Sequence, residues 1–121
     1  MYLPAHFEEV RPEELQRLIS ASALGALVLN GPAGLDANHI PFLFDAPAGP
    51  DEGAGRLRAH VARANPLWRE TADAADALVI FRGADAYISP NWYPTKRERH
   101  RSVPTWNYEV VHAHGTVHIH D

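Results

Sequence analysis

Cysteine is absent from the 121-residue sequence, and no apolar run approaches the ~20 residues that a membrane-spanning helix requires. The first absence excludes disulfide frameworks, thiolate metal sites and thiol nucleophiles. Basic residues are also few, at 11 against 15 acidic residues, for a net charge of −4. The molecule as a whole therefore does not attract nucleic acid, and any polyanion site must be local. The first ten residues have neither a basic end nor an apolar core, so we expect a cytoplasmic protein without a signal peptide.

The remaining composition, 45% hydrophobic and 21% charged residues, is typical of a globular protein, and the length predicts one domain over residues 1–121. Helical spacing of apolar residues predicts a helix over residues 11–23, with Pro12 in its first turn. A second, short helix is predicted from Asn65 to about Ala75, with Asn65 as its cap and Pro66 as its first residue.

Strand patterns fill most of the remaining chain. They cover residues 24–30, residues 39–45 with Pro41 marking an edge or a bulge, residues 56–62, two segments around a turn at Gly83, and residues 103–121. Residues 46–55 are turn-forming and acidic, which predicts a loop. Roughly six short strands with two small helices predict a mainly antiparallel sheet curled into a barrel.

The segment RLRAHVARANPLW, residues 56–68, is the first candidate site. A strand would place Arg58 and His60 on its polar face, with Arg63 at its end and the backbone N–H groups of the next helix close by. This combination suits a phosphate group. A helix cap beside solvated arginines is the alternative, and helix N-termini are far more common than anion sites.

Aromatic residues gather in a second segment, AYISPNWYPTKRERHRSVPTWNY, residues 86–108. The segment also holds a run of net charge +3 at residues 96–101. Aromatic area beside positive charge suits a flat, anionic ligand, but it equally suits a partner subunit. The charged run by itself is typical of a solvated loop.

The last strand alternates, with Val111, Ala113, Val117 and Ile119 on one face and four histidines, His112, His114, His118 and His120, on the other. Neighbouring imidazoles on one strand face are close enough to share a metal ion. An ordinary half-exposed strand has the same pattern, and we assign no metal site. No nucleophile elbow or phosphate-binding glycine loop occurs, and Ser89 before Pro90 is expected to be a turn residue or a ligand hydrogen-bonder. We therefore predict no catalytic residue.

Several segments together resemble the PaiB-like, FMN-binding negative transcriptional regulators of bacteria. In chain order the matching pieces are MYLPAHFEE, LDANHIPFLFD, LRAHVARANPLW, ALVIFRGADAYISPNWYPTK and VPTWNYEVVHAHG. They cover nearly the whole chain, and ISPNWYP together with VPTWNY is the specific part of the signature. Members of the family continue past the VHAHG strand, so we expect this chain to lack the C-terminal region that is usual among them.

The resemblance implies an FMN-binding split barrel, related in fold to pyridoxamine-phosphate oxidase, that forms a homodimer with flavin sites between the subunits. It implies that the strand over residues 38–42 runs along the flavin and that a second group binds the phosphate. A third group would face the site from the partner subunit, with two more residues close by. The residues along the flavin would be Asn38, His39, Ile40 and Phe42, and those at the phosphate would be His60, Arg63 and Asn65. The residues from the partner subunit would be Tyr87, Ser89 and Trp92, with Lys96 and Trp106 close by.

The family assignment implies a homodimeric regulator that binds FMN, with the basic run at residues 96–101 as its one candidate DNA contact. A flavin-dependent oxidoreductase of the same fold is one alternative, in which His39 or His60 could supply a proton. A dimerisation module without a cofactor is another.

Overall fold

The computed structural model of the chain describes residues 1–92 and 104–121. Its helices are η1 (Ala5–Phe7), α1 (Pro12–Ala21), η2 (Pro50–Glu52), α2 (Leu67–Glu70) and η3 (Pro90–Trp92), where η denotes a 3₁₀-helix. Its strands are β1 (Leu24–Gly31), β2 (Gly34–Pro41), β3 (Leu43–Asp45), β4 (Arg56–Arg58), β5 (Ala75–Ile88) and β6 (Thr105–Val117). The prediction of a mainly antiparallel β domain with small helices is confirmed. No helix among these is long and apolar enough to cross a membrane.

The strands form an open sheet of four, in the order β2-β1-β5-β6, and a separate antiparallel hairpin of β3 and β4. Within the described part of one chain the sheet does not close into a barrel, and β2 and β6 are its two edges. The strand predicted over residues 39–45 is in fact two strands that meet near Pro41. Pro41 is the last residue of β2, on the edge of the sheet, where its missing N–H costs no ladder bond. The Phe42 N–H still donates to the Ala23 carbonyl at 2.9 Å, and Leu43–Asp45 then pair with β4.

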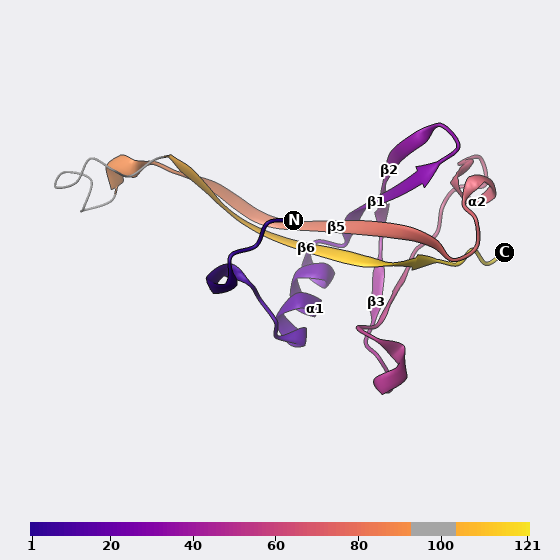
Figure 1. The fold of residues 1–121 in the computed structure, drawn as a ribbon, viewed down its shortest axis with the longest axis horizontal. Helices are drawn as coiled ribbons and strands as arrows, with labels where there is room; N and C mark the ends of the chain where they lie inside the picture. Colours follow the sequence, from indigo (N-terminus) through magenta and orange to yellow (C-terminus); the bar gives the residue numbers. More distant parts are fainter. Residues whose placement is uncertain (93–103) are drawn as a thin grey trace.

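The hydrophobic core lies on one face of this sheet, under α1 (Figure 1). Leu18 and Ile19 of α1 pack there with alternate residues of the strands, and Phe81 of β5 is fully buried. The ring of Phe42 meets that of Phe81 edge-to-face, with centroids 5.7 Å apart. The other core residues are Leu27, Leu29, Ile40, Leu67 and Val79.

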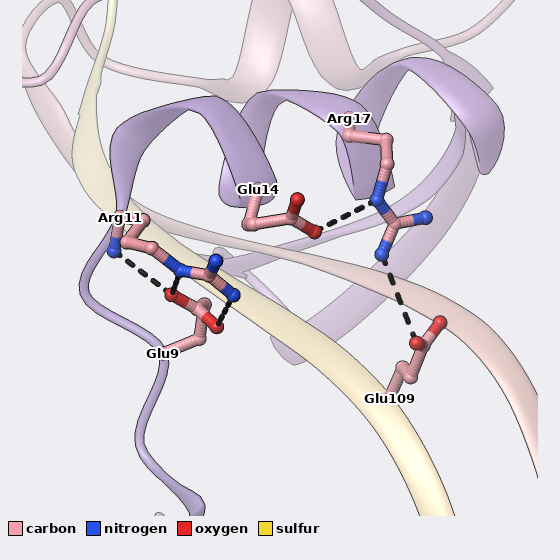
Figure 2. Close-up of polar contacts among 5 residues, drawn as sticks. All are labelled: Glu9, Arg11, Glu14, Arg17 and Glu109. Atoms are coloured by element: carbon pink, nitrogen blue, oxygen red, sulfur yellow. Dashed lines mark hydrogen bonds and ion pairs between the residues drawn. The ribbon is translucent and has the colours of Figure 1, made fainter.

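Polar contacts hold the start and the middle of α1 (Figure 2). Pro12 is its first residue, as predicted, because the missing N–H would have no helical partner there. Just before it, Arg11 Nε donates to Glu9 Oε1 at 2.7 Å, and this hydrogen bond lowers the pKa of Glu9 to about 2. Near the middle of α1, Arg17 lies between Glu14 of the helix and Glu109 of β6, with its Nη2 3.8 Å from Glu109 Oε1.

The predicted turn at Gly83 was wrong, because β5 runs through this position without a break. The pairing with β6 shifts between Arg82 and Asp85, where β5 carries one extra residue, a β-bulge. A side chain at Gly83 would lie 2.7 Å from Glu109 Oε2 and 3.4 Å from Leu18. Glycine therefore allows close packing inside a strand here, rather than a reversal of the chain.

β5, with 14 residues, is much longer than either of the two strands predicted for this part of the chain, whereas β6, with 13 residues, is shorter than the predicted strand over residues 103–121. The two strands pair along their whole length. Their distal ends and η3 project beyond the rest of the molecule (Figure 1). We call this projection the arm; it comprises residues 85–92 and 105–108. A two-stranded ribbon of this kind is only marginally stable in water by itself.

Other predicted elements are shorter than expected. The strand over residues 56–62 covers only Arg56–Arg58, and the helix after Asn65 is one turn, Leu67–Glu70, with Pro66 as its N-cap residue. Residues 46–55 form the predicted connection between two strands and contain η2. Across that hairpin, the Arg58 guanidinium hydrogen-bonds the Asp45 carboxylate and lowers the pKa of Asp45.

The alternation predicted for the last strand is confirmed within β6. Val111, Ala113 and Val117 pack against the core, whereas His112 and His114 lie on the opposite face. β6 ends at Val117, so His118 and His120 lie beyond it, and His118 Nδ1 is 2.9 Å from Asp73 Oδ1. Among the residues that the structure describes, no three histidine or acidic side chains are grouped as metal ligands.

Candidate functional site

The structure brings together Asn38 of β2, which was predicted to run along the flavin, and Asn65 before α2, which was predicted at the phosphate end. Asn65 Nδ2 donates to Asn38 Oδ1 at 3.1 Å, and the Leu67 backbone N–H donates to Asn65 Oδ1 at 3.0 Å. Asn65 thus satisfies one of the unpaired donors at the start of α2 and joins it to the sheet edge. Asn38 Nδ2 in turn lies 3.3 Å from Asp36 Oδ2.

Arg63 is exposed at the same corner and is positioned mainly by Trp68 of α2. The Trp68 Nε1–H donates to the Arg63 carbonyl at 2.9 Å, and the guanidinium carbon lies 5.9 Å from the indole centroid. Arg63 Nη2 is also 2.6 Å from Asp121 Oδ1, although both side chains are about four-fifths exposed, 78% and 80%. An ion pair this exposed adds little stability, so the guanidinium is available to another anion.

The other residues of the strand predicted to run along the flavin lie in different surroundings. Ile40 and Phe42 are buried in the core, so only their backbone could meet a ligand, whereas His39 is exposed on the opposite face of the sheet. Because β2 is an edge strand, one row of its backbone groups has no partner strand. His60 lies exposed after β4, in the segment that leads to Arg63.

The predicted aromatic group lies on the arm. The rings of Tyr87 and Trp106 are paired across β5 and β6 with centroids 5.9 Å apart, and Trp92 of η3 lies 6.5 Å from Tyr87. All three are largely exposed, at 46%, 54% and 67%. Trp106 Nε1 donates to Asp85 Oδ1 at 3.0 Å, which fixes the indole. Ser89 accepts a hydrogen bond from the Asn91 backbone N–H, as expected of a turn residue.

These two groups do not meet within one chain. α2 and the tip of the arm lie near opposite ends of the long axis of the molecule (Figure 1). The first group offers amide donors and a cation, which suit an anion such as phosphate, and the second offers exposed rings for a planar ligand. Lys96 and the basic run at residues 96–101 lie outside the described residues.

The sequence analysis missed the residues that orient the site. Trp68 holds the main chain and side chain of Arg63, and Asp85 holds Trp106. The only sequence signal for Trp68 is an aromatic residue five positions after an arginine, which has no specific meaning without the turn between them. Asp85 is brought to Trp106 by the bulge, which periodicity does not reveal.

Comparisons with known proteins agree with these features. The family described as "Putative FMN-binding domain" matches residues 1–121. An uncharacterized protein of Saccharomyces cerevisiae is 35% identical over 139 residues, covering 98% of this chain and 79% of the relative. The Bacillus subtilis protein named "Protease synthase and sporulation protein PAI 2" is 35% identical over 115 residues, covering 95% of this chain and 51% of the relative.

An uncharacterized protein of Emericella nidulans is 34% identical over 142 residues, and this chain spans 57% of its length. The chain therefore corresponds to about half to four-fifths of these relatives. The family match covers every residue of the chain. Its description names FMN, which is the cofactor that the resemblance implied. The chain belongs to the PaiB-like family of FMN-binding domains.

Proposed function

We propose that this chain binds FMN as a homodimer, in which each site combines the Asn38–Asn65 corner of one protomer with the arm of the other. The observation that carries the proposal is the separation of the two predicted ligand-binding groups at opposite ends of one chain (Figure 1). A second copy related by a twofold axis can supply to each corner the aromatic group that the chain itself holds too far away.

The exposed surface of the chain supports a dimer. Its accessible area is 9457 Å², whereas a compact monomer of 13.4 kDa exposes about 6,500 Å². Residues 93–103 lie outside the described part of the chain, and subtracting about 160 Å² for each, the most that they can expose, still leaves about 1,600 Å² more than a compact chain of the remaining size. A standard interface buries about 800 Å² per partner, so the excess is enough for an extensive one.

The residues at the corner fit the phosphate of FMN. Arg63 can form a charge-assisted hydrogen bond, and the amides of Asn38 and Asn65, which are hydrogen-bonded to each other, can add neutral ones. His60 precedes Arg63 by three residues and is exposed. When bound, FMN supplies reversible electron transfer. The chain's own residues hold the phosphate, and the aromatic side chains of the arm shield the flavin ring from water.

Titration with FMN during light-scattering chromatography tests both parts of this proposal. We expect a dimer of about twice 13.4 kDa that binds two FMN molecules, with quenching of flavin fluorescence. Trp106→Ala should weaken FMN binding, whereas Tyr2→Ala, an exposed aromatic residue at the N-terminus, should not. A monomer that binds FMN with full stoichiometry would contradict the composite site.

We further propose that the homodimer acts as a negative transcriptional regulator, as its resemblance to the PaiB-like regulators suggests. A promoter fragment should shift in a gel, and charge reversal at Arg97, Arg99 and Arg101 should weaken the shift. No shift at low salt would refute this role. Oxidation of reduced nicotinamide by the FMN-loaded protein would instead support a flavin-dependent oxidoreductase.

A further inference from the structure

We propose that the second protomer docks on the sheet face opposite the core and that protonation of the histidines on this face opposes docking. This inference rests on the homodimer proposed above, and it adds the contact surface and a pH-dependent control of assembly.

The face opposite the core, which we call the open face, has no helix over it in the described part of the chain. The strand register aligns two rows of residues across all four strands of the sheet. One row is His39, Ala26, Ile80 and His112, and the other is Ala37, Val28, Leu78 and His114. The four central aliphatic residues remain only half-buried, although central strands usually have both faces covered or one face polar.

The open face continues without interruption into the arm. Every second residue of β6 from Trp106 to His114 shares this face, and the bulge in β5 keeps Asp85 and Tyr87 on it as well. Met1, Trp106, Tyr108 and His112 help to line a hollow of about 400 Å³ at the base of the arm. The aliphatic rows and the aromatic side chains of the arm therefore form one continuous surface, and we commit to a second copy of the chain as its occupant.

The charged and titratable groups of this face are mostly basic. They are His39, Arg82, His112, His114 and the N-terminal amine of Met1, with the carboxylates of Asp76 and Asp85 at its two ends. Asp85 already contacts Trp106 and lies 3.9 Å from Arg82. The rings of His112 and His114 are 6.5 Å apart. Neutral imidazoles can be buried between two such faces, whereas imidazolium groups would repel one another and Arg82.

The size of the effect follows from linkage. Each imidazole that is protonated in the free protomer but must be neutral in the dimer weakens the dimer, about tenfold for every pH unit over which it takes up its proton. If His112 alone is buried in both protomers, the dissociation constant rises about 100-fold over one such pH unit. If His114 is buried in the dimer as well, the dissociation constant rises by a larger factor.

Sedimentation of the full chain without added flavin, at both pH values, tests the proposal. The wild-type dimer should weaken at least 100-fold at pH 5.5. The double variant His112→Gln and His114→Gln should remain dimeric and lose most of this pH dependence, and His120→Gln, beyond the end of β6, should keep it. A constant wild-type dissociation constant, or an unchanged pH dependence in the double variant, would overturn the control by protonation.

A charge in the aliphatic rows tests the surface itself. Ala26→Glu should give a folded monomer at both pH values, whereas Ser20→Glu, exposed on α1, should leave the dimer intact. Ala37→Glu, at an exposed position of the same face, provides the test if Ala26→Glu does not fold. A persistent dimer in both face variants would refute this inference alone, whereas a wild-type monomer at pH 7.5 would refute the proposed homodimer.

Discussion

Replacing Arg63 with alanine should weaken FMN binding and leave riboflavin binding nearly unchanged. The two ligands share the isoalloxazine ring and the ribityl chain, and only FMN carries the phosphate. Arg63 is the exposed cation at the corner where Asn38 and Asn65 meet, and Trp68 holds it there. Its loss removes a charge-assisted contact without disturbing the buried core, in which Arg63 takes no part.

The magnitude follows from the two contacts that compete for this guanidinium. A hydrogen bond to a charged group contributes about 1.5 to 3 kcal/mol. Binding of phosphate displaces the exposed ion pair with Asp121, which is worth at most about 1 kcal/mol. The net loss should be about 0.5 to 3 kcal/mol, or about 2- to 150-fold in the dissociation constant of FMN.

Isothermal titration at pH 7.5 in a buffer without phosphate measures both ligands. Arg69→Ala is the matched control, because Arg69 lies over the same indole, 4.8 Å from its centroid, but in α2 rather than at the corner. We expect that control to bind FMN as the wild type does. Equal losses for FMN and riboflavin in the Arg63 variant would show that the phosphate does not bind at this corner.

Three further predictions concern the fold that supports this site. Gly25→Ala should lower the free energy of unfolding by about 1 to 3 kcal/mol in urea titrations, because the new methyl would lie 2.8 to 3.0 Å from core side chains; a stability equal to wild type would show that the core adjusts freely. Asn65→Ala should cost about 1 to 2 kcal/mol by the same assay, since it removes the hydrogen bonds to Asn38 and to α2. Arg58 lowers the pKa of Asp45, so this carboxylate stabilises the fold above its usual pKa and the contribution disappears as the pH falls through the lowered value. The melting temperature of Asp45→Asn should therefore fall less than that of the wild type between pH 5 and pH 3, and parallel curves would exclude this contribution.

Local patterns predicted those parts of the fold that local physics determines. Apolar spacing and Pro12 located α1, and alternation correctly assigned the two faces of β6. Gly83 misled the analysis because glycine is used both in turns and where another chain segment approaches closely. Only the tertiary contact with Glu109 distinguishes the two uses.

The candidate site was harder to predict, because its geometry depends on separate segments. Asn65 was expected as a helix cap, and its side chain does accept from the backbone of α2, but its contact with Asn38 joins residues 27 positions apart. The helix itself is a single turn, and Asn65 already accepts from one of the backbone N–H groups expected to bind the anion. Side chains and the edge of β2, more than a helix terminus, therefore provide the groups for an anion.

A composite site also makes flavin binding and dimerisation depend on each other. If each site needs residues from two protomers, FMN binds the dimer and not the monomer, and by linkage it must strengthen the dimer. The FMN concentration at half-saturation should then rise when the protein is diluted below its dimer dissociation constant, and it should become constant well above it. Trp106→Ala, which removes an arm residue, should shift the whole curve to higher FMN without changing this trend. A half-saturation point that stays constant across the monomer–dimer transition would mean that one chain forms the entire site, in spite of the distance between its two halves.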